Sequence, residues 1–130
     1  MFLFINTASA EEIILALADG KGQILVKKNI KAKYKQSEKL LLNIDRILKD
    51  IKDIKGIIVV KGPGSFTALR IGVATANTLA WALHLPIVGV KLEEKTKMAA
   101  VIEKSVKKII KYKKFRLVMP EYGMEPNISE

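Results

Sequence analysis

The fold is decided by the stretch Gly62-Pro63-Gly64-Ser65-Phe66-Thr67-Ala68-Leu69-Arg70-Ile71-Gly72. Residues 57–60 before it form a continuous β-branched run, which is typical of a central strand covered on both faces. The glycines and the proline predict a tight turn, and residues 66–84 after it have the apolar spacing of a helix that ends before Pro86. A strand, a loop and a helix in succession are the unit of an α/β fold.

Upstream of this unit, the sequence predicts three strands and a helix. The apolar run at residues 2–5 is a buried strand, and residues 13–18 and 23–28 are two further strands joined by a glycine-containing hairpin loop. An amphipathic helix follows, with Gln36 or Ser37 as its N-terminal cap and its end near Gly56.

Downstream, residues 87–90 form another buried strand, residues 96–111 a third helix, and residues 116–130 a tail laid on the surface. The predicted order up to this last strand is β-β-β-α-β-α-β. A meander followed by crossover connections gives a mixed five-stranded sheet flanked by helices.

Composition narrows the function classes. The 130 residues carry a formal net charge of +10, and 49% of them are hydrophobic, which suits one folded domain. The absence of cysteine excludes disulfides, zinc-thiolate sites and thiol nucleophiles, and the single histidine, His84, excludes a histidine-rich metal centre. The N-terminus has no basic leader before its apolar run, so we expect a cytoplasmic protein. Arg70 and Asn77 interrupt the apolar helix, which predicts a buried helix and no membrane span.

Lysine supplies most of the positive charge, in two clusters. We expect most of these lysines to form a solvated surface, although either cluster could meet an acidic partner or an RNA backbone. The first cluster is Lys27, Lys28, Lys31, Lys33, Lys35 and Lys39, and the second is Lys104, Lys107, Lys108, Lys111, Lys113, Lys114 and Arg116.

The turn between the central strand and its helix is a candidate phosphate-binding loop. Free backbone N–H groups and the helix dipole favour an anion at such a helix start. The residues that could form it are Gly62, Gly64, Ser65 and Thr67. The alternative is a tight turn that binds nothing, with the Ser65 side chain capping the helix.

The helix after the turn has a second, unusual face, formed by Arg70, Ala74, Asn77 and Trp81. It is neither a charged solvated surface nor core, and tryptophan and arginine are enriched at interface hot spots. We therefore expect it to contact a partner helix, with the exposed apolar Leu42 of the first helix nearby. In the alternative, Trp81 packs under the protein's own tail.

Four segments carry a family resemblance. They are Leu3-Phe4-Ile5-Asn6-Thr7-Ala8, Gln36-Ser37-Glu38-Lys39-Leu40-Leu41, the stretch from Gly62 to Gly72, and Pro86-Ile87-Val88-Gly89-Val90. In this order they resemble the TsaB (YeaZ) family over residues 1 to about 93, and Pro120-Glu121-Tyr122 resembles the family's closing segment.

The resemblance implies an actin-like ATPase (ASKHA, RNase H-like) subdomain and a role in making threonylcarbamoyladenosine in tRNA. It implies a non-catalytic subunit that pairs with its paralogue TsaD through the two helices after the meander, assisted by TsaE, and meets tRNA through the complex. No resident cofactor is implied, with ATP or ADP bound only at the complex interface.

This chain departs from the family pattern at three points. Asn6 replaces the usual Asp, which argues against intrinsic ATP hydrolysis, and Gln36 replaces the usual His. Residues 1–93 resemble the N-terminal subdomain, whereas residues 94–130 offer only a helix and a tail in place of the second subdomain.

The leading hypothesis is therefore a scaffold for TsaD, anchored by Arg70 and Trp81. The alternatives are a small nucleotide-binding protein that uses the loop at residues 62–67, and a homodimer that buries the same helices against themselves.

Overall fold

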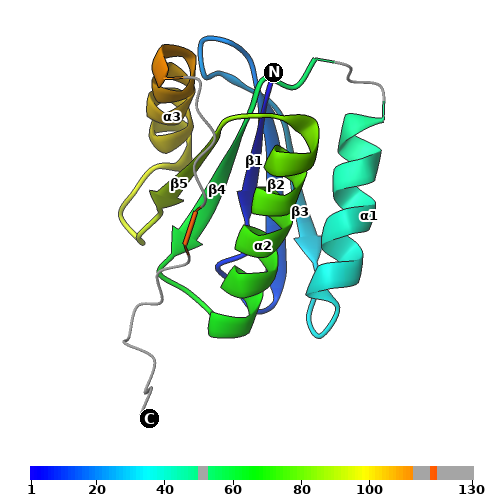
Figure 1. Cartoon of the computed structure of the whole chain (residues 1–130). Coiled ribbons are helices and arrows are strands. Elements are labelled where there is room, and N and C mark those ends of the chain that lie inside the picture. The colour runs from blue at the N-terminus through cyan, green and yellow to red at the C-terminus, as the bar shows by residue number, and fades with distance from the viewer. Residues whose placement is uncertain (50–52, 113–117, 120–130) are drawn as a thin grey trace.

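A mixed five-stranded sheet forms the centre of the computed structural model, which describes residues 1–49, 53–112 and 118–119 (Figure 1). The strands lie in the order β3-β2-β1-β4-β5. β1 pairs antiparallel with β2 and parallel with β4, β2 pairs antiparallel with β3, and β4 pairs parallel with β5. Their bounds are β1 Phe2–Asn6, β2 Glu12–Ala18, β3 Ile24–Lys31, β4 Gly56–Gly62 and β5 Ile87–Lys91. The predicted mixed sheet and its element order are confirmed.

Three helices cover the two faces of the sheet (Figure 1). The helices α1 (Gln36–Leu48) and α2 (Phe66–Leu83) pack on one face, here called the front. The helix α3 (Met98–Tyr112) packs on the opposite face, the back. None of these three helices combines the length and apolarity that crossing a membrane requires.

The central strands are apolar throughout because both of their faces are covered. In β1, Leu3 and Ile5 belong to the front core, whereas Phe2 and Phe4 belong to the back core. Successive side chains of a strand point to opposite faces, so a two-sided core needs an unbroken apolar run. The same alternation holds in β4, and it explains the β-branched run that the sequence shows there.

The helix α3 completes the back core. Its residues Ile102, Val106 and Ile109 are buried in one cluster with Phe4 and Ile58. The described part of residues 94–130 therefore shares a core with residues 1–93. That residues 94–130 stand in place of a second subdomain remains a prediction, and the expected tail at residues 116–130 lies, apart from Val118 and Met119, outside the described residues.

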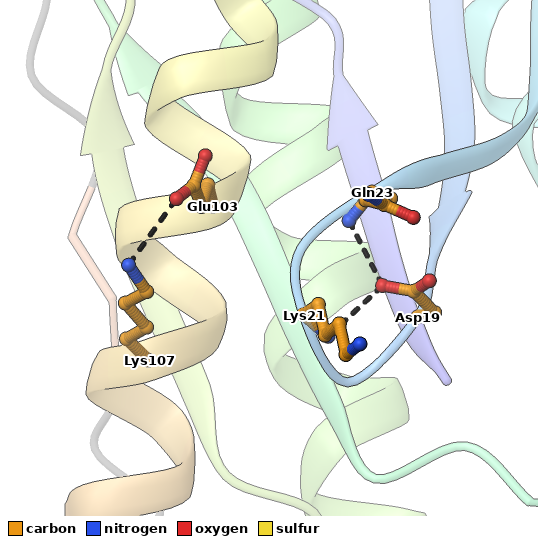
Figure 2. Close-up of polar contacts among 5 residues, drawn as sticks. All are labelled: Asp19, Lys21, Gln23, Glu103 and Lys107. Carbon is orange, nitrogen blue, oxygen red and sulfur yellow. Dashed lines mark hydrogen bonds and ion pairs between the residues drawn. The ribbon is translucent and has the colours of Figure 1, made fainter.

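The hairpin turn between β2 and β3 lies against α3 (Figure 2). The Oδ1 atom of Asp19 accepts hydrogen bonds from the backbone N–H groups of Gln23 and Lys21, each at 2.9 Å. These bonds favour the ionised carboxylate, and the bond from Gln23 is the main reason that the pKa of Asp19 is lowered. A Cβ on Gly22 would lie 2.5 Å from the Cα of Glu103, so the turn contacts the helix backbone directly.

Candidate functional site

The loop between β4 and α2 is held at both of its ends. The carbonyl of Gly62 accepts a hydrogen bond from the N–H of Leu92 at 3.1 Å, and the N–H of Ser65 donates to the carbonyl of Ala8 at 2.8 Å. Gly62 has a φ of 149°, a conformation that side-chain-bearing residues rarely adopt, and its peptide bond to Pro63 is cis. The loop is thus bound to the residue after β5 on one side and to the segment after β1 on the other.

The segment after β1 is bound by three more hydrogen bonds. The Thr7 hydroxyl donates to the carbonyl of Ala68 at 2.8 Å, and the N–H of Ala8 donates to Oδ1 of Asn6 at 2.9 Å. The side-chain Nε2 of Gln36 donates to the carbonyl of Ala10. Asn6 and Gln36, the two residues that depart from the family pattern, therefore both bind the backbone of residues 8–10.

In the candidate phosphate-binding loop, two of the predicted residues, Ser65 and Gly64, already contact the backbone of Ala8. The expected side-chain cap is wrong, because the Ser65 side chain makes no capping hydrogen bond to α2 and its N–H is used by Ala8. A Cβ on Gly64 would lie 2.5 Å from the carbonyl oxygen of Ala8, so this glycine is required by the protein's own backbone. Thr67 is exposed on the first turn of α2. Within the described ranges no three His, Asp or Glu side chains come together as metal ligands, and phosphate binding by the loop remains a prediction.

The predicted interface face of α2 divides into two parts. Arg70, Ala74 and Trp81 are exposed, and Trp81 shows 71% of its surface. Asn77 instead turns toward the C-terminal segment, where its side-chain amide donates to the carbonyl of Val118 at 2.8 Å and accepts from the N–H of Val118 at 2.9 Å. Within the described part of the tail, Val118 thus contacts Asn77, and Trp81 is exposed; the rest of the tail lies outside the described residues.

The exposed surface of α2 includes one residue that the predicted interface face lacks. Thr78 is exposed and lies in line with Ala74 and Trp81, so it takes the place expected for Asn77. The spacing i, i+4, i+8 and i+11 from Arg70 fits this line equally well, and spacing alone does not separate the two positions.

The two ends of α2 carry further apolar surface. Phe66 and Leu83 are 47% and 49% exposed, because the buried residues of α2 lie between Ala68 and Ala80. The Arg70 guanidinium lies 5.4 Å from the centroid of the Phe66 ring, a cation–π contact at the surface.

The helix α1 packs beside α2 (Figure 1). It adds exposed apolar side chains to this surface. Leu42 is 48% exposed, and its neighbour Leu41, which the sequence analysis did not single out, is 61% exposed. Three consecutive leucines cannot all lie on one buried stripe of a helix, which is the sequence signal for Leu41. We call Leu41, Leu42, Phe66, Arg70, Ala74, Thr78 and Trp81 the front surface.

Comparison with known proteins identifies a family that this chain matches. The model of the family described as TsaD, tRNA N6-adenosine threonylcarbamoyltransferase, matches residues 29–112, more than half of the chain. The tRNA threonylcarbamoyladenosine biosynthesis protein TsaB of Bacillus subtilis is 58% identical over 36 residues, which are 28% of this chain and 16% of that protein. A tRNA N6-adenosine threonylcarbamoyltransferase of Geotalea daltonii is 38% identical over 80 residues, which are 58% of this chain and 24% of that enzyme. The matched stretches thus span a quarter or less of these relatives' own lengths.

Among solved structures, YeaZ from Pseudomonas aeruginosa has a similar fold. It superposes with a TM-score of 0.61 at 24% sequence identity, and the match covers 69% of this chain and 43% of that one. The sequence resemblance is confirmed by these matches, and the α/β fold with its mixed sheet is shared with YeaZ. The chain therefore belongs to the family described as TsaD, tRNA N6-adenosine threonylcarbamoyltransferase, and it is similar to the TsaB and YeaZ proteins named above.

Proposed function

We propose that this chain is a non-catalytic subunit that pairs with TsaD, through its front surface, in the threonylcarbamoylation of tRNA. The observation that carries the proposal is the exposure of Trp81. A tryptophan that shows 71% of its surface leaves a large apolar area in water, and tryptophan and arginine are the side chains that dominate binding energy at protein interfaces.

The residue composition of the chain favours a non-catalytic subunit. With one histidine and no cysteine in 130 residues, the chain cannot supply a histidine pair for a catalytic metal. A catalytic subunit such as TsaD would provide that chemistry, and TsaE would join the pair as the family resemblance implies. We also infer a cytoplasmic location, where tRNA is modified, and contact with tRNA in the complex.

The shape of the front surface fits a helical partner. The two helices lie side by side and both begin at the lower end of the sheet in Figure 1. At about 1.5 Å per residue, Leu42 lies roughly 9 Å from the start of α1 and Trp81 roughly 22 Å from the start of α2. The exposed apolar groups are thus spread along both helices, as a bundle of partner helices would need.

The nucleotide-binding alternative has less support. It requires N–H groups of the loop at residues 62–67 to face a phosphate, and the N–H of Ser65 already binds Ala8. Calorimetry of the isolated chain with ATP and Mg²⁺ distinguishes this alternative, since micromolar binding would favour it.

The test of pairing is co-purification of the chain with TsaD from the same genome, followed by titration and light scattering. We expect a stable heterocomplex, and the double variant Arg70→Ala/Trp81→Ala should raise its Kd at least about thirtyfold, because loss of one interface hot spot costs about 2 kcal/mol or more. Tyr34→Ala/Lys35→Ala is the matched control, since both residues are exposed outside the front surface.

Two results would overturn the pairing proposal. One is a heterocomplex whose Kd is the same with and without the side chains of Arg70 and Trp81. The other is a chain that forms a homodimer and does not bind TsaD, which would support the homodimer alternative.

A further inference from the structure

The helix α3 has one buried side and one basic side. Its buried residues are Ile102, Ser105, Val106 and Ile109. The opposite side carries Lys104, Lys107, Lys108 and Lys111, all exposed, at the spacing i, i+3, i+4 and i+7. Residues at these intervals share one face of a helix, so the four ammonium groups form a continuous row. We call this row the α3 lysine stripe.

The charge of the stripe is largely uncompensated. Lys107 pairs with Glu103 at 3.2 Å, as Figure 2 shows. Lys104, Lys108 and Lys111 have no carboxylate within ion-pairing distance in the part of the chain that the structure describes. Glu103 is the single acidic residue of α3. Three neighbouring cations without counterions favour a polyanion over any single acidic group.

The fold distributes the lysines of β3, which belong to the first lysine cluster, over both faces of the sheet. Two of them lie on the back face, on the same side as α3. Lys28 pairs with Leu15, whose side chain belongs to the front core, so Lys28 lies on the front face of β3. Lys27 pairs with Ala16 of the back core, so Lys27 lies on the same face of the sheet as α3. Lys31 is four residues further along the strand and shares the face of Lys27. The positive charge of the back face therefore comes from two elements.

We propose that the α3 lysine stripe binds the phosphate backbone of RNA directly. Lysine is depleted at the centre of protein–protein interfaces, whereas lysine and arginine are the side chains that contact phosphate oxygens. The four lysines span about 10 Å of helix axis, enough for several consecutive phosphates. Tyr112 is exposed at the end of the stripe, with the Lys111 ammonium 5.5 Å from its ring centroid, and offers a surface on which an unpaired base can stack.

A membrane surface fits this helix less well than RNA does. A helix that lies on a lipid surface inserts its apolar side between the lipids. The apolar side of α3 is buried against the sheet, with Ile102, Val106 and Ile109 at most 3% exposed. Outside this buried side, Ile110 and Tyr112 are the exposed large apolar side chains in the described part of α3, too few to anchor the helix in a lipid layer. A backbone of phosphates can bind the lysines without any apolar insertion.

The inference does not rest on pairing with TsaD. The stripe belongs to α3, which lies across the sheet from α1 and α2, the helices that carry the front surface (Figure 1). The experiment uses the full chain alone. The Kd for unmodified tRNA is measured by fluorescence anisotropy at several salt concentrations, for the wild type and for Lys104→Gln/Lys108→Gln/Lys111→Gln. The control is Lys28→Gln/Arg46→Gln/Lys49→Gln, which removes the same number of exposed charges from the front.

We expect the wild type to bind with a Kd between about 1 and 100 μM, and the binding to weaken steeply with salt. The stripe variant should raise the Kd at least about tenfold at roughly 100 mM salt and lower the slope of log K against log salt by about two. The control variant should change the Kd less than about twofold, and circular dichroism should show that both variants melt as the wild type does.

Each of three results would overturn the proposal. In the first, the wild type fails to bind tRNA at roughly 100 mM salt. In the second, the stripe variant and the control variant lose affinity for tRNA equally, which would assign the binding to net charge alone. In the third, polyglutamate or vesicles containing phosphatidylglycerol bind as tightly as tRNA and lose the same affinity in the stripe variant, which would assign the stripe to an acidic protein or a lipid surface.

Discussion

Asn77 shows how a single side chain can bind a backbone segment from a distant part of the chain. Its amide makes both hydrogen bonds that the Val118 peptide groups offer, at 2.8 and 2.9 Å, and the Val118 side chain is 8% exposed in the front core. An amide is suited to this role because it carries a donor and an acceptor on one planar group.

Asn77→Ala should therefore destabilise the protein by about 1–3 kcal/mol, because both hydrogen bonds are lost and the Val118 backbone is left without these partners. Urea denaturation gives the free energy of unfolding, and hydrogen exchange should show faster exchange of the Val118 N–H. Thr78→Ala, on the exposed neighbour, should change the stability by less than about 0.5 kcal/mol. Equal stability of the two variants would contradict this role for Asn77.

Gly72 allows α2 to approach the segment after β1. A Cβ at this position would overlap the Oγ1 atom of Thr7, which is fully buried and donates its hydrogen bond to Ala68. Gly72→Ala should therefore cost about 1–3 kcal/mol, since α2 must shift or the hydrogen bond must break. In Gly20→Ala, the added methyl meets nothing within 4 Å, and stability should stay the same or rise slightly. Chemical denaturation compares the two, and a neutral Gly72→Ala would show that α2 can move away from Thr7 freely.

At the scale of elements, α3 acts as a structural layer as well as a charged surface. Its isoleucines test this distinction with one type of substitution. Ile102 is fully buried in the back core, so Ile102→Ala should cost about 2–5 kcal/mol in the free energy of unfolding. Ile110 is 46% exposed, and Ile110→Ala should cost less than about 1 kcal/mol. A small effect at Ile102 would mean that α3 is a separate appendage and that the sheet is stable without it.

The segment after β1 is fixed by hydrogen bonds from both backbone groups and side chains. The backbone carbonyls of the segment at residues 7–10 accept hydrogen bonds from Ser65, in the loop between β4 and α2, and from Gln36 of α1. Three segments that are far apart in the sequence thus meet at the carboxyl end of β1. In α/β folds, ligand sites form at the carboxyl ends of the strands. In this chain the N–H of Ser65 and the side-chain amide of Gln36 are engaged there by the protein itself.

At the scale of the whole molecule, the sheet separates two surfaces of different chemistry. The front surface is apolar with an arginine, and the back surface is a stripe of lysines. Because the two surfaces share no residue, we expect the two kinds of binding to be independent. Arg70→Ala/Trp81→Ala should leave the Kd for tRNA within about twofold of the wild type, and the stripe variant should leave the Kd for TsaD equally unchanged. Anisotropy and calorimetry measure the two constants, and a variant that weakens both would show that the surfaces are coupled or that the fold is damaged.

Much of this architecture is predictable from local patterns. The sequence predicts the order of strands and helices, the start of α2 and the exposure of Arg70, Ala74, Trp81 and Leu42, and the structure agrees. Periodicity and the positions of glycine and proline act within a few residues, so a single sequence contains them in full. The two ends of α1 were predicted wrongly: the N-cap is Lys35 and not Gln36 or Ser37, and the helix ends at Leu48 and not near Gly56.

The amino-acid sequence by itself determined the element order, the two-sided core and the basic character of α3, because each depends on residue type and spacing along the chain. Only the tertiary structure decided that Asn77 binds Val118, 41 residues away, and that the N–H of Ser65 binds Ala8. It also decided that the lysines of β3 divide between two faces while those of α3 stay together. The physical reason is that a hydrogen-bond partner or a shared face is a property of distances in space, and residues far apart in the sequence acquire those distances only when the sheet and its helices have packed.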